Sequence, residues 1–209
     1  VVEAGTGATD FAVHAQEGRL YVSNWQRNSI QVIDLETQTL RTPIPSGRDV
    51  YKLSAGRSGR IYSEGMDQWV SGVIINSATG AEIANAGSFR EGDGELDPSG
   101  RYYYHCDNNI SNAHITRYDV QADTFVQTAT STEHPYGSRN LVMSGDGSRL
   151  FWQGYGYDAA LNELKSYGTQ IYATTYRGEV VFSDSKAFNG ASGSQLGSLP
   201  VTTTVSVVA

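Results

Sequence analysis

Three similar four-residue motifs recur at intervals of 41 residues along the chain: GRLY at Gly18–Tyr21, GRIY at Gly59–Tyr62 and GRYY at Gly100–Tyr103. A repeat of this regularity is typical of a protein built from stacked copies of one supersecondary unit. We expect each glycine to take a positive φ at the end of a tight turn. The aromatic residues that follow should then begin a central strand that is buried on both faces.

The first copy contains four strand-like runs, each short and rich in β-branched or aromatic residues. Turn-forming residues such as Gly, Asn, Ser and Thr separate them. The runs are Phe11–Ala15, Leu20–Asn24, Ile30–Leu35 and Thr39–Ile44. Four strands in about 41 residues is the size of one propeller blade, so the repeat predicts an all-β propeller of four-stranded blades.

Weaker copies fill the rest of the chain and are anchored on Gly147 and Gly178. The spacing widens to 47 residues before Gly147, which predicts a loop insertion. It then narrows to 31 residues, which predicts that the fourth copy lacks its outermost strand or two. Residues 1–209 thus form one propeller domain or a propeller fragment with about five repeat units. The repeats lie approximately at 8–47, 48–88, 89–133, 134–168 and 169–201, and a further one begins at 202–209.

Composition argues against several classes of protein. The net charge of −7 and the pI near 5.0 disfavour nucleic acid and anionic membrane surfaces as partners. No run of about 18 apolar residues exists, so no membrane insertion is predicted. Cys106 is the single cysteine, which excludes a disulfide within these residues.

Two stretches resemble a known repeat family. GRLYVSNWQRNSIQVIDLETQTL at 18–40 and VMSGDGSRLFW at 142–152 are similar to the YVTN repeat of seven-bladed β-propellers, with its Ser-Pro-Asp-Gly turn, Leu-Tyr-Val-Thr-Asn strand and Val-Ile-Asp strand. The resemblance covers roughly residues 8–165, and no copy has the whole turn intact. It implies a larger, seven-bladed ring, an exported or cell-surface location with the periplasm as an alternative, and a binding or scaffold role more often than catalysis.

The function expected from these features is a non-catalytic module that recognises carbohydrate or protein through loops on one face. Exposed aromatic rings can stack on a ligand while nearby polar groups orient it. The candidates after second strands are Trp25, Arg27, Trp69, Asp107 and Tyr155, and those near the linkers between repeats are Arg48, Asp49, Glu91, Asp93, Glu95, His134, Tyr136 and Arg139. Alternatively, Trp25 and Trp69 pack into the core. No catalytic residue, metal or cofactor is assigned.

Two other functions remain open at this point. A propeller hydrolase or lyase acting on sugars or lactones could use residues near one mouth of the channel, namely Glu91, Asp93, Glu95, His134 and Arg139. Glu95 and Asp97 lie two apart and hence on one side of a strand, so this pair of carboxylates could supply general acid and base in glycoside cleavage or hold a divalent cation. Asp97 is equally explained as the first residue of an Asp-Pro-Ser-Gly turn. A structural subunit could assemble through the strand-like segment VTTTVSVVA at 201–209, which could pair with another chain.

Single polar residues in the predicted strands have two interpretations each. Cys106 is either a small buried apolar residue or a nucleophile that meets His114 or His134 through the fold. His14 is expected to be a hydrogen-bonded core histidine. The four histidines show no zinc-like spacing.

Overall fold

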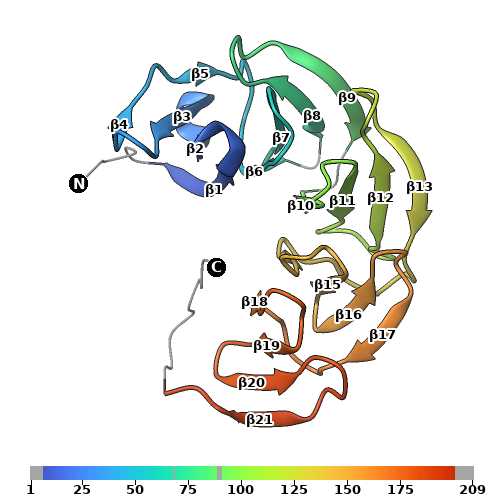
Figure 1. Ribbon diagram of the computed structural model, residues 1–209. Helices are drawn as coiled ribbons and strands as arrows, with labels where there is room; N and C mark the ends of the chain where they lie inside the picture. Colours follow the sequence, from blue (N-terminus) through green and yellow to red (C-terminus); the bar gives the residue numbers. More distant parts are fainter. Residues whose placement is uncertain (1–6, 68, 89–90, 201–209) are drawn as a thin grey trace.

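The computed structural model describes residues 7–67, 69–88 and 91–200, which form five antiparallel sheets in chain order (Figure 1). Sheet 1 contains β1 (Ala8–His14), β2 (Arg19–Asn24), β3 (Ser29–Asp34), β4 (Thr39–Leu40) and β5 (Ile44–Pro45). Sheet 2 contains β6 (Lys52–Ala55), β7 (Arg60–Glu64), β8 (Ser71–Asn76) and β9 (Glu82–Ser88). Sheet 3 contains β10 (Asp93–Leu96), β11 (Tyr102–Cys106), β12 (Ile115–Asp119) and β13 (Val126–Thr130). Sheet 4 contains β14 (Leu141–Met143), β15 (Arg149–Trp152), β16 (Tyr155–Asp158) and β17 (Glu163–Ser166). Sheet 5 contains β18 (Ala173–Thr174), β19 (Val180–Phe182), β20 (Lys186–Asn189) and β21 (Gln195–Ser198).

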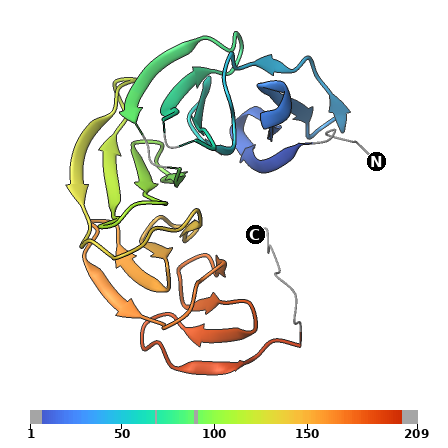
Figure 2. The same ribbon diagram turned by 180° about the vertical axis from the view of Figure 1, so that it is seen from behind.

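Each sheet is a meander in which strands pair in chain order, with β5 added on β3 in sheet 1. The first strands of successive sheets contact one another: β1 with β6, β6 with β10, β10 with β14, and β14 with β18. The sheets stand side by side in an arc, with their first strands on the inner side and their last strands at the perimeter (Figures 1 and 2). The arc is open between sheet 1 and sheet 5 (Figure 1).

The predicted all-β repeat of four-stranded units is confirmed, and every sheet lies within its predicted repeat. The expectation that the fourth copy lacks outer strands is wrong, because sheet 4 has four strands. The shorter spacing between Gly147 and Gly178 comes from a tight turn instead. Gln153 and Gly154, with φ of 54° and 89°, join β15 directly to β16. Two positive φ values at adjacent turn residues suit a two-residue hairpin. The further repeat at 202–209 and the self-association through it lie outside the described residues.

The repeated glycines have the backbone that the sequence predicts. Gly18, Gly59, Gly100, Gly147 and Gly178 all have φ between 60° and 72°. Each one ends the turn between the first and second strand of its sheet. Only glycine adopts this left-handed conformation without a steric penalty from Cβ, which explains why each copy of the repeated motif begins with Gly.

Four apolar clusters fill the spaces between adjacent sheets. Consecutive residues of one central strand belong to different clusters: Ile61 packs against sheet 1, and Tyr62 packs against sheet 3. Tyr103 likewise faces sheet 2, where its ring stacks on Tyr62 with centroids 5.3 Å apart, whereas Tyr104 faces sheet 4. Both faces of the central strands are therefore buried, as their continuous apolar runs predict.

We predict that Gly59→Ala lowers the free energy of unfolding by about 1 kcal/mol, because alanine is strained at φ 72°. A Cβ at this position meets no atom within 4 Å, so the effect isolates backbone strain. Gly197→Ala is the matched control, since its Cβ also meets nothing and its φ is not positive. Urea unfolding of both variants measures the difference, and equal stabilities would contradict the role assigned to the repeated glycine.

Candidate functional site

In every sheet, the linker before the first strand and the loop after the second strand lie at the same end of the strands, because successive strands are antiparallel. We call this end the loop face. It contains described residues of the linkers 46–51, 91–92, 131–140 and 167–172, of the loops that follow β2, β7, β11 and β19, and of the two-residue turn that follows β15. Most of the predicted ligand-binding residues lie on these segments.

Arg139 joins three segments of the loop face. Its Nη2 donates hydrogen bonds to the Met66 carbonyl oxygen at 2.6 Å and to Glu91 Oε2 at 2.7 Å. Its guanidinium also lies over the Tyr51 ring, 5.2 Å from the centroid. Asp49 Oδ2 accepts a hydrogen bond from the Met66 amide at 2.9 Å. The structure thus brings the predicted residues Asp49, Glu91 and Arg139 together, although they come from three different linkers.

Two aromatic side chains project from the loop face. Trp69 is 77% exposed and Tyr136 is 78% exposed. The alternative that Trp69 packs into the core is therefore wrong. Trp25 is 37% exposed at the start of a short 3₁₀ turn, Trp25–Arg27, and Arg27 at the end of that turn is exposed as well.

Arg48 does not contact Asp49, Glu91 or Arg139 through its side chain. Its Nη1 donates to the Ser71 carbonyl oxygen at 3.2 Å, and its Nη2 binds the Glu82 carboxylate in the outer strand β9. The side chain therefore ties the linker to the third and fourth strands of sheet 2, and we assign it a structural role.

His134 and Tyr155 pack against each other and against neighbouring side chains, so we assign them a structural role as well. His134 is buried, and its Nε2 lies 2.8 Å from the Tyr157 hydroxyl. The ring of Tyr155 lies against His134, with centroids 4.0 Å apart. Tyr155 begins strand β16 and does not lie in a loop as predicted, because the tight turn at Gln153 and Gly154 leaves no loop there.

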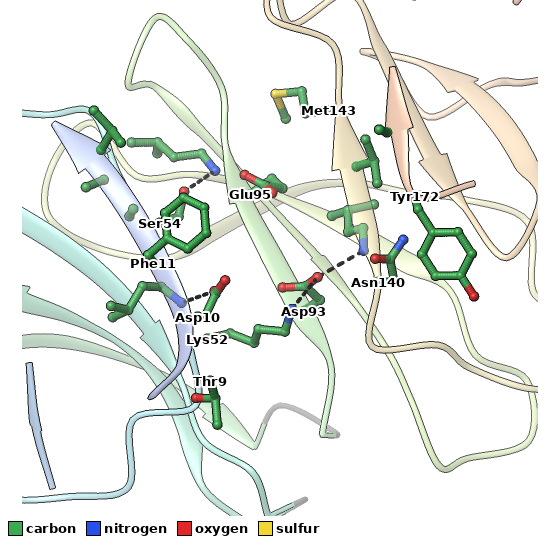
Figure 3. A pocket seen from close by; sticks show the side chains of 18 of the residues that line it. Thr9, Asp10, Phe11, Lys52, Ser54, Asp93, Glu95, Asn140, Met143 and Tyr172 are labelled. Carbon is green, nitrogen blue, oxygen red and sulfur yellow. Dashed lines mark hydrogen bonds and ion pairs between the residues drawn. The ribbon is translucent and has the colours of Figure 1, made fainter. Parts of the chain in front are cut away.

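A cavity of about 740 Å³ lies at the centre of the arc and is lined by residues of all five first strands or the residues beside them (Figure 3). Its polar lining residues are Thr9, Asp10, Lys52, Ser54, Asp93, Glu95, Asn140, Tyr172 and Thr174. Of these, the sequence analysis singled out only Asp93 and Glu95. The signal for the others was weak: Asp10 and Lys52 are single charged residues in the otherwise uncharged first strands β1 and β6.

The charged residues of the cavity also link neighbouring sheets. Lys52 Nζ in sheet 2 lies 3.1 Å from Asp93 Oδ2 in sheet 3, and the same oxygen accepts a hydrogen bond from the Leu141 amide of sheet 4 at 3.0 Å. Asp10 Oδ2 in sheet 1 accepts one from the Leu53 amide of sheet 2 at 2.8 Å. Figure 3 shows these contacts as dashed lines around the cavity. These carboxylates therefore hold the first strands at fixed separations.

Burial raises the pKa of three carboxyl groups in this cavity. It raises the pKa of Asp10 to about 6, opposed by the Lys52 ammonium and assisted by Asp93. Burial also raises the pKa of Asp93, again opposed by Lys52. The pKa of Glu95 rises well above its usual range because of burial and of the nearby Asp93 and Asp10. Burial acts against the charge of Lys52, but Asp93 and Asp10 raise its pKa above the ordinary lysine value.

A second polar network is buried between sheets 2 and 3. His105 Nδ1 lies 2.9 Å from Glu64 Oε1, and this oxygen accepts a hydrogen bond from the Tyr103 hydroxyl at 2.7 Å. On its other side, His105 Nε2 lies 3.5 Å from Asp107 Oδ1, and His114 Nδ1 lies 3.2 Å from Asp107 Oδ2. Burial opposes the imidazolium, yet Glu64 and Asp107 raise the pKa of His105 to about 9. Asp107 is thus a buried structural residue, and its side chain is not exposed to contact a ligand as predicted.

The remaining single residues follow their structural interpretations. Cys106 is fully buried, burial raises the pKa of its thiol well above the usual range, and its Sγ lies against the Ser138 carbonyl oxygen. Asp97 accepts hydrogen bonds from the Arg101 and Tyr102 amides, as the turn hypothesis predicts. It therefore does not form a pair with Glu95 in the cavity.

Within the described ranges, no group of three or more His, Cys, Asp or Glu side chains is arranged to hold a metal ion. The same residues include no helix with the length and apolar character that crossing a bilayer requires.

Comparisons with known proteins show the fold alone. No family model matches the chain, and no curated protein is significantly similar to it. Among solved structures 1023 chains match, so the likeness points to a widespread architecture and to no particular activity. One of them, hydrazine synthase of Kuenenia stuttgartiensis, is 16% identical with a TM-score of 0.59, and the match covers 95% of this chain and 50% of that chain. The chain thus spans about half the length of that structure.

We predict that stability falls at alkaline pH through His105. Its pKa of about 9 in the folded state exceeds the value of 6.5 expected for an unfolded chain, so its contribution is complete below about pH 6.5 and is lost as pH rises through 9. The loss should be on the order of 3 kcal/mol. Urea unfolding of the wild type and of His105→Gln from pH 6 to 10 measures it. The stability difference between the two proteins should shrink over this range, and a difference independent of pH would contradict the assignment.

Proposed function

We propose that the five sheets are blades of a YVTN-like β-propeller and that the chain is a non-catalytic binding module that recognises carbohydrate on its loop face. The recurrent glycine turn, the meander order and the central position of every first strand support the propeller interpretation. An exported or cell-surface location belongs to the same proposal and follows from the resemblance to YVTN repeats.

The observation that carries the binding role is the junction at Arg139. It fixes loops from sheet 2 and from the linkers before sheets 3 and 4 by two hydrogen bonds and a cation–π contact. Loops that are already ordered lose little conformational entropy when a ligand binds. Trp69 follows Met66 of the junction by three residues, and Tyr136 precedes Arg139 by three residues. Each exposed ring is therefore anchored close to a fixed point.

A carbohydrate suits this surface better than a protein. Trp69 and Tyr136 belong to separate loops, and the junction near them consists of charged and polar groups. Sugar rings stack on single flat aromatic faces while their hydroxyl groups bond to such polar groups. A protein ligand would instead favour a continuous apolar core surrounded by a polar rim.

We predict that Trp69→Ala and Tyr136→Ala each weaken carbohydrate binding about tenfold, the effect of losing one aromatic stacking contact. A glycan array identifies the ligand, and isothermal titration calorimetry then gives the affinities. Tyr176→Ala is the matched control, because Tyr176 is 67% exposed but lies in the turn between β18 and β19, at the opposite end of the sheets.

The proposed function would be abandoned if no glycan binds at millimolar concentration, or if the double variant of Trp69 and Tyr136 binds as tightly as the wild type. Turnover of a bound glycan that is abolished by Glu95→Gln would favour the hydrolase or lyase alternative.

A further inference from the structure

We propose that the central cavity is a second ligand site, which takes a small carbohydrate that carries no acidic group. This site does not depend on the binding role proposed for the loop face. The cavity is lined mainly by first strands, and it shares with the linkers of the loop face only Asn140 and Tyr172, the residues directly before β14 and β18.

The size and the walls of the cavity suit a small polyhydroxylated ligand. Its volume of about 740 Å³ falls within the range of pockets that enclose small molecules. Figure 3 shows Phe11 and Tyr172 on opposite sides of the cavity, with Asp93, Glu95 and Asn140 between them. Phe11 is 41% exposed although it lies in a strand, so its ring is available for stacking.

Hydrogen-bonding capacity remains in the cavity after the contacts between sheets are made. Glu95 lines the cavity, and within the described residues its side-chain carboxyl group has no hydrogen-bond partner, whereas its backbone pairs with Tyr104 of β11. Asn140 donates from Nδ2 to the Ile171 carbonyl oxygen at 2.7 Å, which leaves its Oδ1 as an acceptor. Carboxyl and amide groups between two rings match the alternating hydroxyl groups and apolar faces of a sugar.

The charges of the cavity exclude acidic ligands. Asp10, Asp93 and Glu95 face a single cation, Lys52, and that ammonium is engaged with Asp93 at 3.1 Å. An anionic sugar would find no free cation in the cavity, because Lys52 is already paired with Asp93, and its charge would lie close to the carboxyl groups of Asp93 and Asp10. A neutral sugar brings no unpaired charge into the cavity, and a protonated amino sugar can pair with Asp10.

The test titrates the whole chain with three matched probes: the trisaccharides of glucose, glucosamine and galacturonic acid. We expect the first two to bind and the galacturonic acid trisaccharide not to bind. Phe11→Ala and Tyr172→Ala should each weaken binding about tenfold, whereas Trp69→Ala and Tyr136→Ala should leave it unchanged. Glu95→Ala, which removes the hydrogen-bonding carboxyl group, should lower the affinity for the glucose and glucosamine trisaccharides, and Glu36→Ala, at an exposed glutamate outside the cavity, is its control.

Thermal unfolding of each variant confirms that it is folded, and Phe11 is exposed enough that its truncation should be tolerated. The inference is overturned if no trisaccharide binds at millimolar concentration, if the acidic trisaccharide binds as tightly as the others, or if the cavity variants bind like the wild type. Binding that is lost only in the loop-face variants would overturn the cavity site and leave the proposed function standing.

Discussion

Burial of both faces of the central strands is the constraint on which the rest of the structure depends. Ile61 and Tyr62 are adjacent in β7 and pack against different neighbouring sheets, and the same is true of Tyr103 and Tyr104 in β11. A single four-stranded sheet with such strands cannot bury its apolar side chains, because each of its two faces needs another sheet to cover it. Stacking of successive copies follows directly from this requirement, and the short turns keep consecutive copies adjacent.

The cavity is a consequence of that stacking. When each sheet places its first strand toward the centre, polar residues from different repeats meet there, and their charges have to be compensated in a partly desolvated space. Lys52 and Asp93 come from adjacent sheets and compensate each other, while Asp10 and Asp93 also bind backbone amides of the next sheet. The same residues therefore stabilise the contacts between sheets and define what the cavity accepts.

The loop face is organised by a different principle. Its segments differ in length and sequence, so packing of the sheets does not fix their conformation. Arg139 supplies the missing connection, because a planar guanidinium can hold a carbonyl oxygen, a carboxylate and an aromatic face at once. Binding of carbohydrate at this face and in the cavity are separate proposals, since one rests on fixed loops and the other on first strands.

The repeat and its glycine turns can be read from the sequence alone, because the positive φ at Gly18, Gly59 and Gly100 and the apolar strands after them are local properties. The sequence leaves two interpretations each for Cys106 and Asp97, and the structure shows that Cys106 is buried and that Asp97 belongs to a turn. Only the tertiary structure decided which residues meet. The contact of Arg139 with Met66 spans 73 positions, and that of Lys52 with Asp93 spans 41. The spacing of 41 residues places Lys52 and Asp93 at equivalent positions of neighbouring repeats. Whether such side chains meet depends on how the sheets are stacked and oriented, which is decided by side-chain packing between repeats and by no local property of the chain.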